Sequence, residues 1–119
     1  MNEQTMIQQI HCEEFGSLAI LMINEAPWFP ATESARILGY TNPRKAIRDH
    51  CRRVANRSSP TNGGLQVTNY IPEGDLYRLI IRSKLPSAER FERWICDQVL
   101  PDLRRHGTYI EAYPGMWTH

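Results

Sequence analysis

TESARILGYTNPRKAIRDHCRRV, residues 32–54, predicts two helices that are separated by a short turn. Thr32 stands where an N-cap residue is expected, and the apolar positions after it predict a first helix that continues to Leu38. Gly39 is expected to end this helix, because glycine readily adopts the backbone conformation that follows many helix C-termini. The tight turn and the new helix that follow make the segment resemble a helix-turn-helix.

The second helix is expected to begin at Pro43. Asn42 is a preferred N-cap residue, and proline is common at the first helical position, where its missing N–H is no loss. We expect this helix to continue to about Val54. At about 100° per residue, its apolar side carries Ala46, Ile47, His50, Cys51 and Val54. Its opposite, basic side carries Arg44, Lys45, Arg48 and Arg52, with Arg53 and Asp49 at the edge.

The basic side of this helix predicts contact with a polyanion. Four cations on one narrow face repel one another, and nucleic-acid phosphates remove that repulsion. The arginine guanidinium can also donate two hydrogen bonds at once to the edge of guanine in the major groove. A plain solvated face is the alternative, but such faces usually mix charges of both signs. Lys45 and Arg48 stand near positions where a standard helix-turn-helix has apolar side chains. We therefore predict a helix-turn-helix-like pair with Pro43–Val54 as the recognition helix.

Charge is distributed unevenly along the chain, although the net charge is only +1. Residues 1–35 contain five acids and no Lys or Arg, whereas residues 36–57 contain seven basic residues against one Asp. Residues 58–119 carry seven charges of each sign. The middle block therefore has the local positive charge that is typical of a surface for polyanions.

The strands of the domain are expected on both sides of this block. Residues 1–14 are polar and are expected to be frayed or to form an edge element. Residues 15–23 and the pair Trp28–Phe29 predict a β-hairpin. Residues 56–64 have the composition of a loop, and the alternation in 65–71 predicts another strand.

Two further helices are expected in the second half of the chain. One follows Pro72, and a longer one begins at Pro86, bends or restarts at Pro101 and ends at Gly107. Their apolar faces consist of Leu76, Leu79 and Ile80 in the first and of Ala88, Phe91, Ile95 and Val99 in the second. The sequence thus predicts a small single α+β domain with β-hairpins and about four helices.

Length, composition and cysteine content indicate a cytoplasmic protein. The 119 residues fit one domain, which can build a core without metal or disulfide. Three widely spaced cysteines, an odd number, indicate reduced thiols. The longest apolar run, residues 18–23, is too short to cross a bilayer, and the first residues lack the features of a signal peptide. We expect no contact with membranes.

Four residues outside the basic helix are further candidates for DNA contact. Tyr40 precedes the helix and is a candidate for a backbone contact, and Arg57 closes the basic block. Arg82 and Lys84 precede the last helix, where they can touch a phosphate or lie in an exposed loop. The sequence leaves both of these alternatives open.

Neither metal binding nor catalysis is expected. The pairs His11–Cys12 and His50–Cys51 lack the close spacing of zinc ligands, and His50 on the apolar side of its helix is better explained as a core histidine bonded to backbone. No nucleophile, base and orienting group can be assembled from the sequence, and the glycines of 62–64 form a turn rather than a phosphate-binding loop. The sequence therefore predicts no cofactor, no metal and no enzymatic activity.

Six stretches, in order, resemble the N-terminal domain of the BRO family, which is found in prophage antirepressors and in BRO proteins of large DNA viruses. They are residues 28–31 (WFPA), 37–43 (ILGYTNP), 46–51 (AIRDHC), 71–80 (IPEGDLYRLI), 82–86 (RSKLP) and 91–109, which includes FERWI and RRHGTY. The resemblance covers residues 15–109, which leaves 1–14 as a polar N-terminal segment and 110–119 as a tail. Family members commonly carry a second, C-terminal domain, so we expect either a stand-alone version or a fragment.

Two functions of different classes are open. The resemblance implies a DNA-binding regulator of phage or prophage genes, often an antirepressor, and the basic helix fits such a role. We expect a homodimer on a palindromic site, because a lone module of this size binds duplex DNA weakly. The alternative is an interaction protein that sequesters a phage repressor and touches no DNA, with the acidic residues of 1–35 imitating the charge of DNA.

Overall fold

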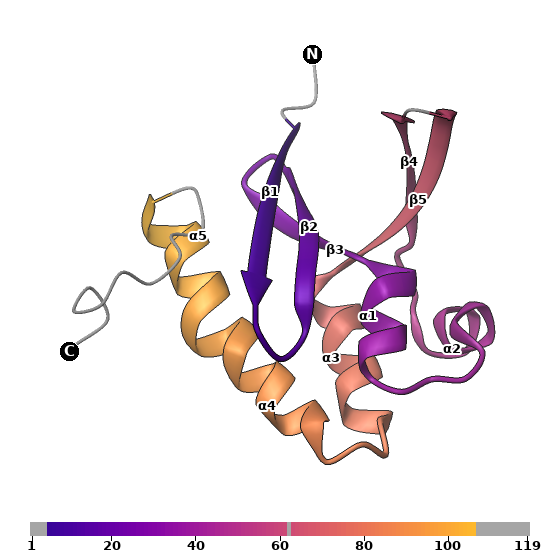
Figure 1. The fold of residues 1–119 in the computed structure, drawn as a ribbon, viewed down its shortest axis with the longest axis vertical. Coiled ribbons are helices and arrows are strands. Elements are labelled where there is room, and N and C mark those ends of the chain that lie inside the picture. Colours follow the sequence, from indigo (N-terminus) through magenta and orange to yellow (C-terminus); the bar gives the residue numbers. More distant parts are fainter. Residues whose placement is uncertain (1–4, 62, 107–119) are drawn as a thin grey trace.

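The computed structural model describes residues 5–61 and 63–106 and shows a five-stranded antiparallel sheet covered by helices (Figure 1). The strands are β1 (Thr5–Cys12), β2 (Gly16–Ile23), β3 (Ala26–Pro30), β4 (Ala55–Thr61) and β5 (Gly64–Pro72), in the spatial order β1-β2-β3-β5-β4. The helices are α1 (Ala31–Ile37), α2 (Pro43–His50), α3 (Glu73–Arg82) and a last long helix composed of α4 (Ser87–Trp94), a π-helical turn η1 (Ile95–Val99) and α5 (Leu100–His106). The prediction of an α+β domain with about four helices is confirmed.

The N-terminal half of the sheet is a pair of hairpins. β1 is the edge element that the sequence allowed for, and it pairs with β2 along its whole length, from Thr5 opposite Ile23 to Cys12 opposite Gly16. The predicted hairpin of β2 and β3 is also present. Its tight turn places Asn24 and Glu25 at positive φ, 50° and 69°. Such turns match the twist of the strands that they connect.

Alternation along β2 divides the side chains between two faces of the sheet. Leu18 and Ile20 are fully buried in the main core, with the apolar faces of the helices. Leu21 belongs to a smaller cluster with Tyr70, against which Trp28 packs. Trp28 is half-buried, because its strand directs it to the face opposite the main core.

The first helix begins earlier than the sequence predicts. Its N-cap residue is Pro30, and no side chain caps it, so Thr32 lies inside α1 and the prediction of a Thr32 cap is wrong. The predicted stop is correct, because Gly39 follows the helix with a φ of +84°. Leu85, from the loop between α3 and α4, packs against Gly39 so closely that a Cβ there would lie 2.6 Å from its side chain.

We expect Gly39→Ala to lower the free energy of unfolding by about 2 kcal/mol, since alanine resists positive φ and collides with Leu85. Chemical denaturation monitored by circular dichroism measures this loss. Gly74→Ala is the matched control, because Gly74 lies in α3 with open space around its Cβ position, and its stability should be unchanged or slightly raised. Equal stability of the two variants would contradict the account of Gly39.

The second helix ends earlier than the sequence predicts. Asn42 caps it as expected, because its side-chain oxygen accepts a hydrogen bond from the Lys45 backbone N–H at 3.2 Å. The helix stops at His50, so the prediction that it continues to Val54 is wrong. Cys51 is already extended, and Val54, expected on the buried side, is 42% exposed. The cause lies in α3, whose Asp75 side chain binds the backbone that follows the helix.

Residues 56–64, expected to form a loop, are mostly strand. β4 pairs with β5 from Ala55 opposite Tyr70 to Thr61 opposite Gly64, and the two form a long ribbon that extends beyond the helices (Figure 1). Asn56 and Ser58 of β4 are exposed, as are Leu65 and Val67 of β5, which accounts for polar residues in this ribbon. The predicted strand at 65–71 is confirmed as β5.

The remaining helices follow the predicted pattern. Leu76, Leu79 and Ile80 of α3 are buried, as are Ala88, Phe91, Ile95 and Val99 of the last helix. The irregularity expected at Pro101 is present as the π-helical turn η1, which precedes this proline. The predicted end at Gly107 and the tail at 110–119 lie outside the described residues.

Candidate DNA-contacting surface

Two hydrogen bonds to α3 and the loop after it fix the turn that sets the direction of α2. The Tyr40 hydroxyl donates a hydrogen bond to the Leu79 carbonyl at 2.7 Å. The Ser83 hydroxyl donates to the Leu38 carbonyl at 2.7 Å and accepts from the Leu85 backbone N–H. Tyr40, predicted to contact a DNA backbone, thus already uses its hydroxyl inside the fold.

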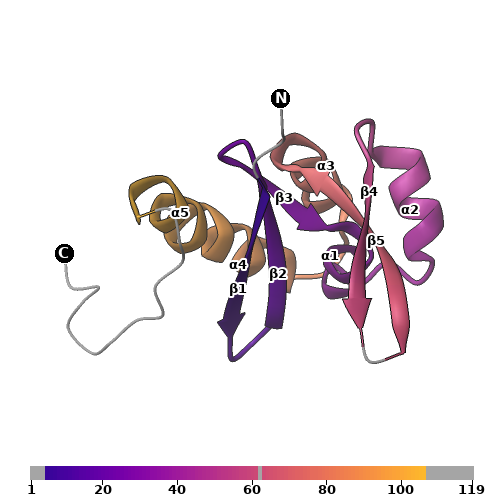
Figure 2. The ribbon, with the colours of Figure 1, turned by 90° about the horizontal axis from the view of Figure 1, so that it is seen from above.

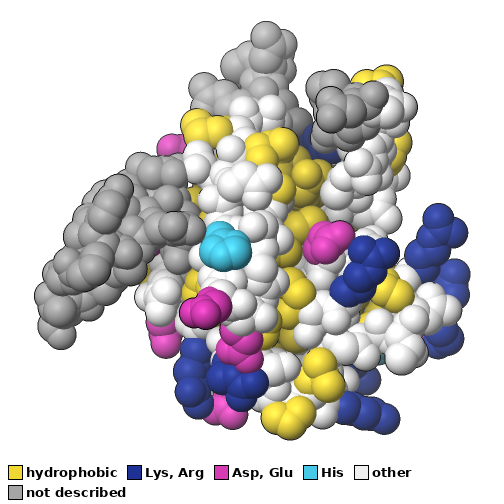
Figure 3. Space-filling model, viewed as in Figure 1, with side chains coloured by type: hydrophobic (Ala, Val, Ile, Leu, Met, Phe, Trp, Pro, Cys, Tyr) yellow, Lys and Arg dark blue, Asp and Glu magenta, His cyan; other side chains and the backbone are white. Residues whose placement is uncertain are grey.

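The exposed side of α2 is basic. Ala46 and Ile47 anchor the helix in the core, whereas its cations face solvent. Lys45 is neutralised, because its Nζ lies 2.6 Å from the Asp49 carboxylate, a hydrogen bond that lowers the pKa of Asp49. Arg44 and Arg48, one turn apart, form no ion pair with any described residue. Figure 3 shows the dark-blue side chains gathered toward the side of the molecule that carries α2, whereas they alternate with magenta over the lower part of α4.

The buried carboxylate of Asp75 explains why α2 ends where it does. This side chain, 4% exposed, accepts hydrogen bonds from the backbone N–H groups of Arg52, at 3.0 Å, and Arg53, at 2.8 Å. Its other oxygen lies 3.5 Å from the Arg78 Nε. The two N–H groups that would continue α2 are bound to α3 instead, so the chain turns toward β4. We call this set of contacts the Asp75 clamp.

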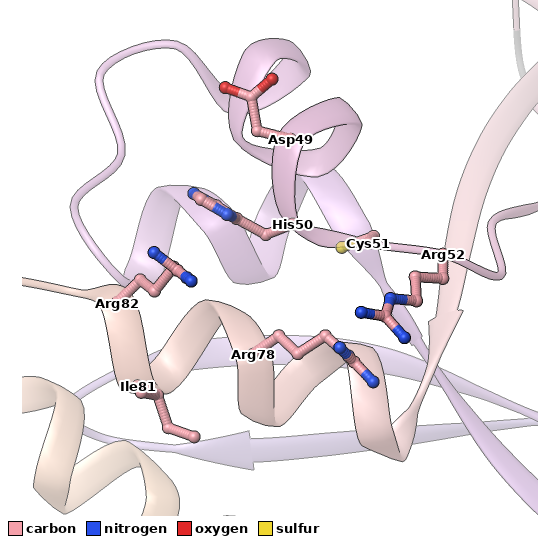
Figure 4. Close-up of a pocket in the computed structure, with 7 residues that line it drawn as sticks. All are labelled: Asp49, His50, Cys51, Arg52, Arg78, Ile81 and Arg82. Atoms are coloured by element: carbon pink, nitrogen blue, oxygen red, sulfur yellow. The ribbon is translucent and has the colours of Figure 1, made fainter.

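A pocket of about 260 Å³ lies between the C-terminal end of α2 and α3. It is lined by Asp49, His50, Cys51, Arg52, Arg78, Ile81 and Arg82. Figure 4 shows the guanidinium groups of Arg52 and Arg78 directed toward one another, and Arg82 beside His50 at the other end. Asp49, the one acid in the lining, points away from them. We call the part formed by Arg52, Arg78, Arg82 and His50 the arginine pocket.

The other predicted contact residues are dispersed. Arg53 packs over the Trp28 ring, 5.5 Å from its centroid, on the face of the sheet opposite the main core. Arg57 lies on β4 and donates a hydrogen bond to the Asn56 carbonyl. Lys84 is in the connection between α3 and α4. Of the predicted residues, the structure thus brings together Arg44, Lys45 and Arg48 on α2, and Arg52 and Arg82 in the arginine pocket.

Arg78 is the basic residue that sequence reasoning missed. It lies four residues before Arg82, so the two share one face of α3. The pair of cations at positions i and i+4 is a signal that the sequence contains. The sequence analysis considered only the apolar face of this helix, which it assigned to the core.

His50 and Cys51 occupy the edge of the pocket rather than the core. Both are half-buried, and the His50 ring lies beside that of Tyr40, with 6.1 Å between centroids. The expected hydrogen bond from His50 to backbone is not among the contacts of the described residues.

Burial and the Asp75 carboxylate raise the pKa of the Cys51 thiol from 9.0 to about 12. No group of three or more potential metal ligands occurs within residues 5–61 and 63–106.

We expect Cys51 of the folded protein to react with iodoacetamide at pH 8 at least about tenfold more slowly than in the unfolded chain, because its raised pKa leaves little thiolate. Peptide mass spectrometry measures the rate. The same shift stabilises the fold below pH 9, and this contribution is lost as the pH rises from 9 toward 12. Equal rates in the folded and unfolded chains would contradict the raised pKa.

Fold and surface together define a small α+β domain in which a helix-turn-helix-like pair presents an exposed basic helix. The sequence of the chain matches the family described as the BRO family, N-terminal domain (Bro-N), over residues 17–101, and the chain belongs to this family. The resemblance noted from its motifs is thereby confirmed.

Several relatives share this part of the chain. An uncharacterized protein of Haemophilus influenzae is 49% identical over 84 residues, which are 69% of this chain and 42% of that protein. The Bro-N domain-containing protein 289L of invertebrate iridescent virus 6 is 28% identical over 120 residues, 82% of this chain and 28% of that protein. The Bro-N domain-containing protein L2 of Acanthamoeba polyphaga mimivirus is 30% identical over 95 residues, 69% of this chain and 39% of that protein.

The chain therefore spans less than half the length of these relatives. The comparison with solved structures finds no match. Within the described part of the chain, no helix combines the length and the apolar character needed to cross a bilayer.

Proposed function

We propose that this domain is a DNA-binding regulator of the phage type, which presents α2 to duplex DNA and acts by binding rather than by catalysis. The observation that carries the proposal is the pair Arg44 and Arg48, which lie one turn apart on the exposed side of α2 and form no ion pair among the described residues. The Bro-N family to which the chain belongs includes proteins of large DNA viruses, which supports the same class of function.

The dimensions of α2 fit the major groove. An α-helix with its side chains is about 10–12 Å in diameter, close to the roughly 12 Å width of the major groove in B-form DNA, and the eight residues of α2 provide about two turns to lie in it. In helix-turn-helix proteins the first residues of the recognition helix contact base edges. Arg44 occupies the corresponding first turn of α2, and Arg48 lies one turn later on the same exposed side. We assign both to bases. The assignment of Lys45 to a phosphate is weaker, since it must first leave Asp49.

A two-fold dimer is part of this proposal. One helix of eight residues supplies few base contacts, so two copies on a palindromic site give the affinity that regulation needs. Half-sites are then expected about 34–36 Å apart, one turn of DNA. Sedimentation of the protein with and without such a site measures the number of copies bound.

The alternative, sequestration of a repressor by an acidic surface, has less support. The acids of the N-terminal region that the structure describes, within residues 5–35, do not gather on one face. Glu14, at the turn between β1 and β2, pairs with Arg90 of α4 at 2.7 Å, and Glu33 pairs with Arg36 of the same helix. Glu25 lies at the opposite end of β2. Without a contiguous negative surface, imitation of DNA charge is difficult to support.

The test is fluorescence anisotropy with two labelled duplexes of equal length, one from the region upstream of its own gene and one of random sequence. We expect tighter binding to the first, and an affinity for both that falls steeply with salt. Absence of binding to either duplex at low salt would overturn the proposal and favour a protein partner, which pull-down with the cognate phage repressor would then address.

A further inference from the structure

We propose that the arginine pocket binds a phosphate group and is a second contact site, distinct from the exposed side of α2. The proposal deepens the proposed function and rests on it for the DNA source of the phosphate. The pocket is a formed concavity between two elements, with three arginines and one histidine in its lining. These three arginines are exposed, like the cations of α2, but they surround one concavity instead of following one helix face.

The charges in the pocket leave a positive excess, which a bound anion can balance. Of the acids nearby, Asp49 is bound to Lys45 and points away (Figure 4). Asp75 is 3.5 Å from Arg78, but its second oxygen is used by two backbone N–H groups. Arg52 and Arg82 form no ion pair with any described residue. Two uncompensated guanidinium groups therefore face one small cavity.

The chemistry of the lining favours phosphate over other anions. Arginine offers parallel N–H donors that match two phosphate oxygens at once, and several arginines can share the oxygens of one phosphate. Part of the lining is held in place, because the Asp75 clamp fixes the backbone at Arg52 and contacts the Arg78 side chain. Less conformational entropy is lost when a ligand meets groups that are already ordered.

The position of the pocket favours a phosphate of the DNA backbone. It lies at the C-terminal end of α2, and this helix is about as long as the major groove is wide. When Arg44, at the other end of α2, reaches base edges, the pocket comes to the rim of the groove, where a sugar-phosphate strand runs. A free phosphorylated compound has the same recognition chemistry, so the test has to separate these two sources.

The variant Arg82→Gln removes one charge from the pocket without touching the clamp, since Arg82 has no part in the Asp75 contacts. Arg78→Gln is the second variant, and thermal unfolding checks that each is folded. Arg93→Gln is the control of equal charge change, because Arg93 lies on α4 and pairs there with Glu89. The readouts are DNA affinity across a salt series and the NMR shifts of the arginine Nε–Hε groups during titration with inorganic phosphate.

We expect Arg82→Gln to weaken binding to every duplex about tenfold and to reduce the salt slope by about one, as loss of a phosphate contact does, with Arg93→Gln unchanged. This result establishes the DNA source. Saturable phosphate shifts in the wild type that vanish in Arg82→Gln, with DNA affinity unaltered or absent, support the pocket and assign it to a free phosphorylated compound, even where the proposed function fails. Unaltered DNA affinity in both pocket variants, with no phosphate-induced shifts in the wild type, would overturn the proposal.

Discussion

Replacement of Asp75 by alanine is expected to lower the free energy of unfolding by about 3 kcal/mol and the melting temperature by roughly 12 °C. The change removes the acceptor of two backbone N–H groups and the partner of Arg78. Buried polar groups that lose their partner cost more than the bond itself was worth, because they were removed from water on folding. Urea denaturation and differential scanning calorimetry measure the two quantities.

Two further variants separate the parts of the clamp. Asp75→Asn keeps one oxygen that can accept hydrogen bonds but loses the charge, so we expect a smaller loss of about 1–2 kcal/mol. Asp97→Ala removes an exposed acid of η1 and should change stability by less than about 0.5 kcal/mol. If Asp75→Ala were no more destabilising than Asp97→Ala, the clamp would not be what holds α2 and α3 together.

The double variant Arg44→Gln with Arg48→Gln is expected to bind its specific duplex about 100-fold more weakly than the wild type. Each arginine that contacts a base through both prongs contributes about 1–3 kcal/mol of discrimination, so loss of two should also erase most of the preference over random sequence. Both side chains are exposed, and the melting temperature should hardly change. Anisotropy titrations at one fixed salt concentration provide the comparison.

The matched control is Arg90→Gln with Arg93→Gln, which removes the same charge from α4. These two arginines pair with Glu14 and Glu89, on a surface of mixed charge. We expect only a small loss of affinity, equal for specific and random duplexes, since the change acts through net charge alone. An equal loss in both double variants would show that α2 contributes charge but does not recognise sequence.

The local signals in the sequence predicted most of the fold. The N-cap at Asn42, the stop at Gly39 and the apolar faces of α3 and the last helix depend on neighbouring residues, which a sequence displays directly. The predicted end of α2 was wrong because a residue distant in the sequence determines it. The end of α2 is set by Asp75, 23 positions after Arg52, and no periodicity within residues 43–54 contains that information.

The ribbon of β4 and β5 illustrates a second limit of prediction from sequence. The Asn, Ser, Pro and Thr residues of β4 favour a loop, and this segment becomes a strand because β5 lies beside it and supplies the backbone partners. For the candidate site, the sequence correctly located the excess of positive charge. It could not show which basic residues lie on the exposed side of α2 and which line the arginine pocket, because this depends on the residue at which α2 ends.

The Asp75 clamp binds peptide groups and not the side chains of positions 52 and 53. The clamp therefore requires only a backbone N–H at these two positions, which excludes proline. Charge, size and polarity at these two positions can change while the path of the chain is kept. Position 75, by contrast, tolerates little besides a carboxylate. The path of the chain at these two positions is thus set through the backbone, so side-chain contacts made there, such as that of Arg53 with Trp28, can change without refolding.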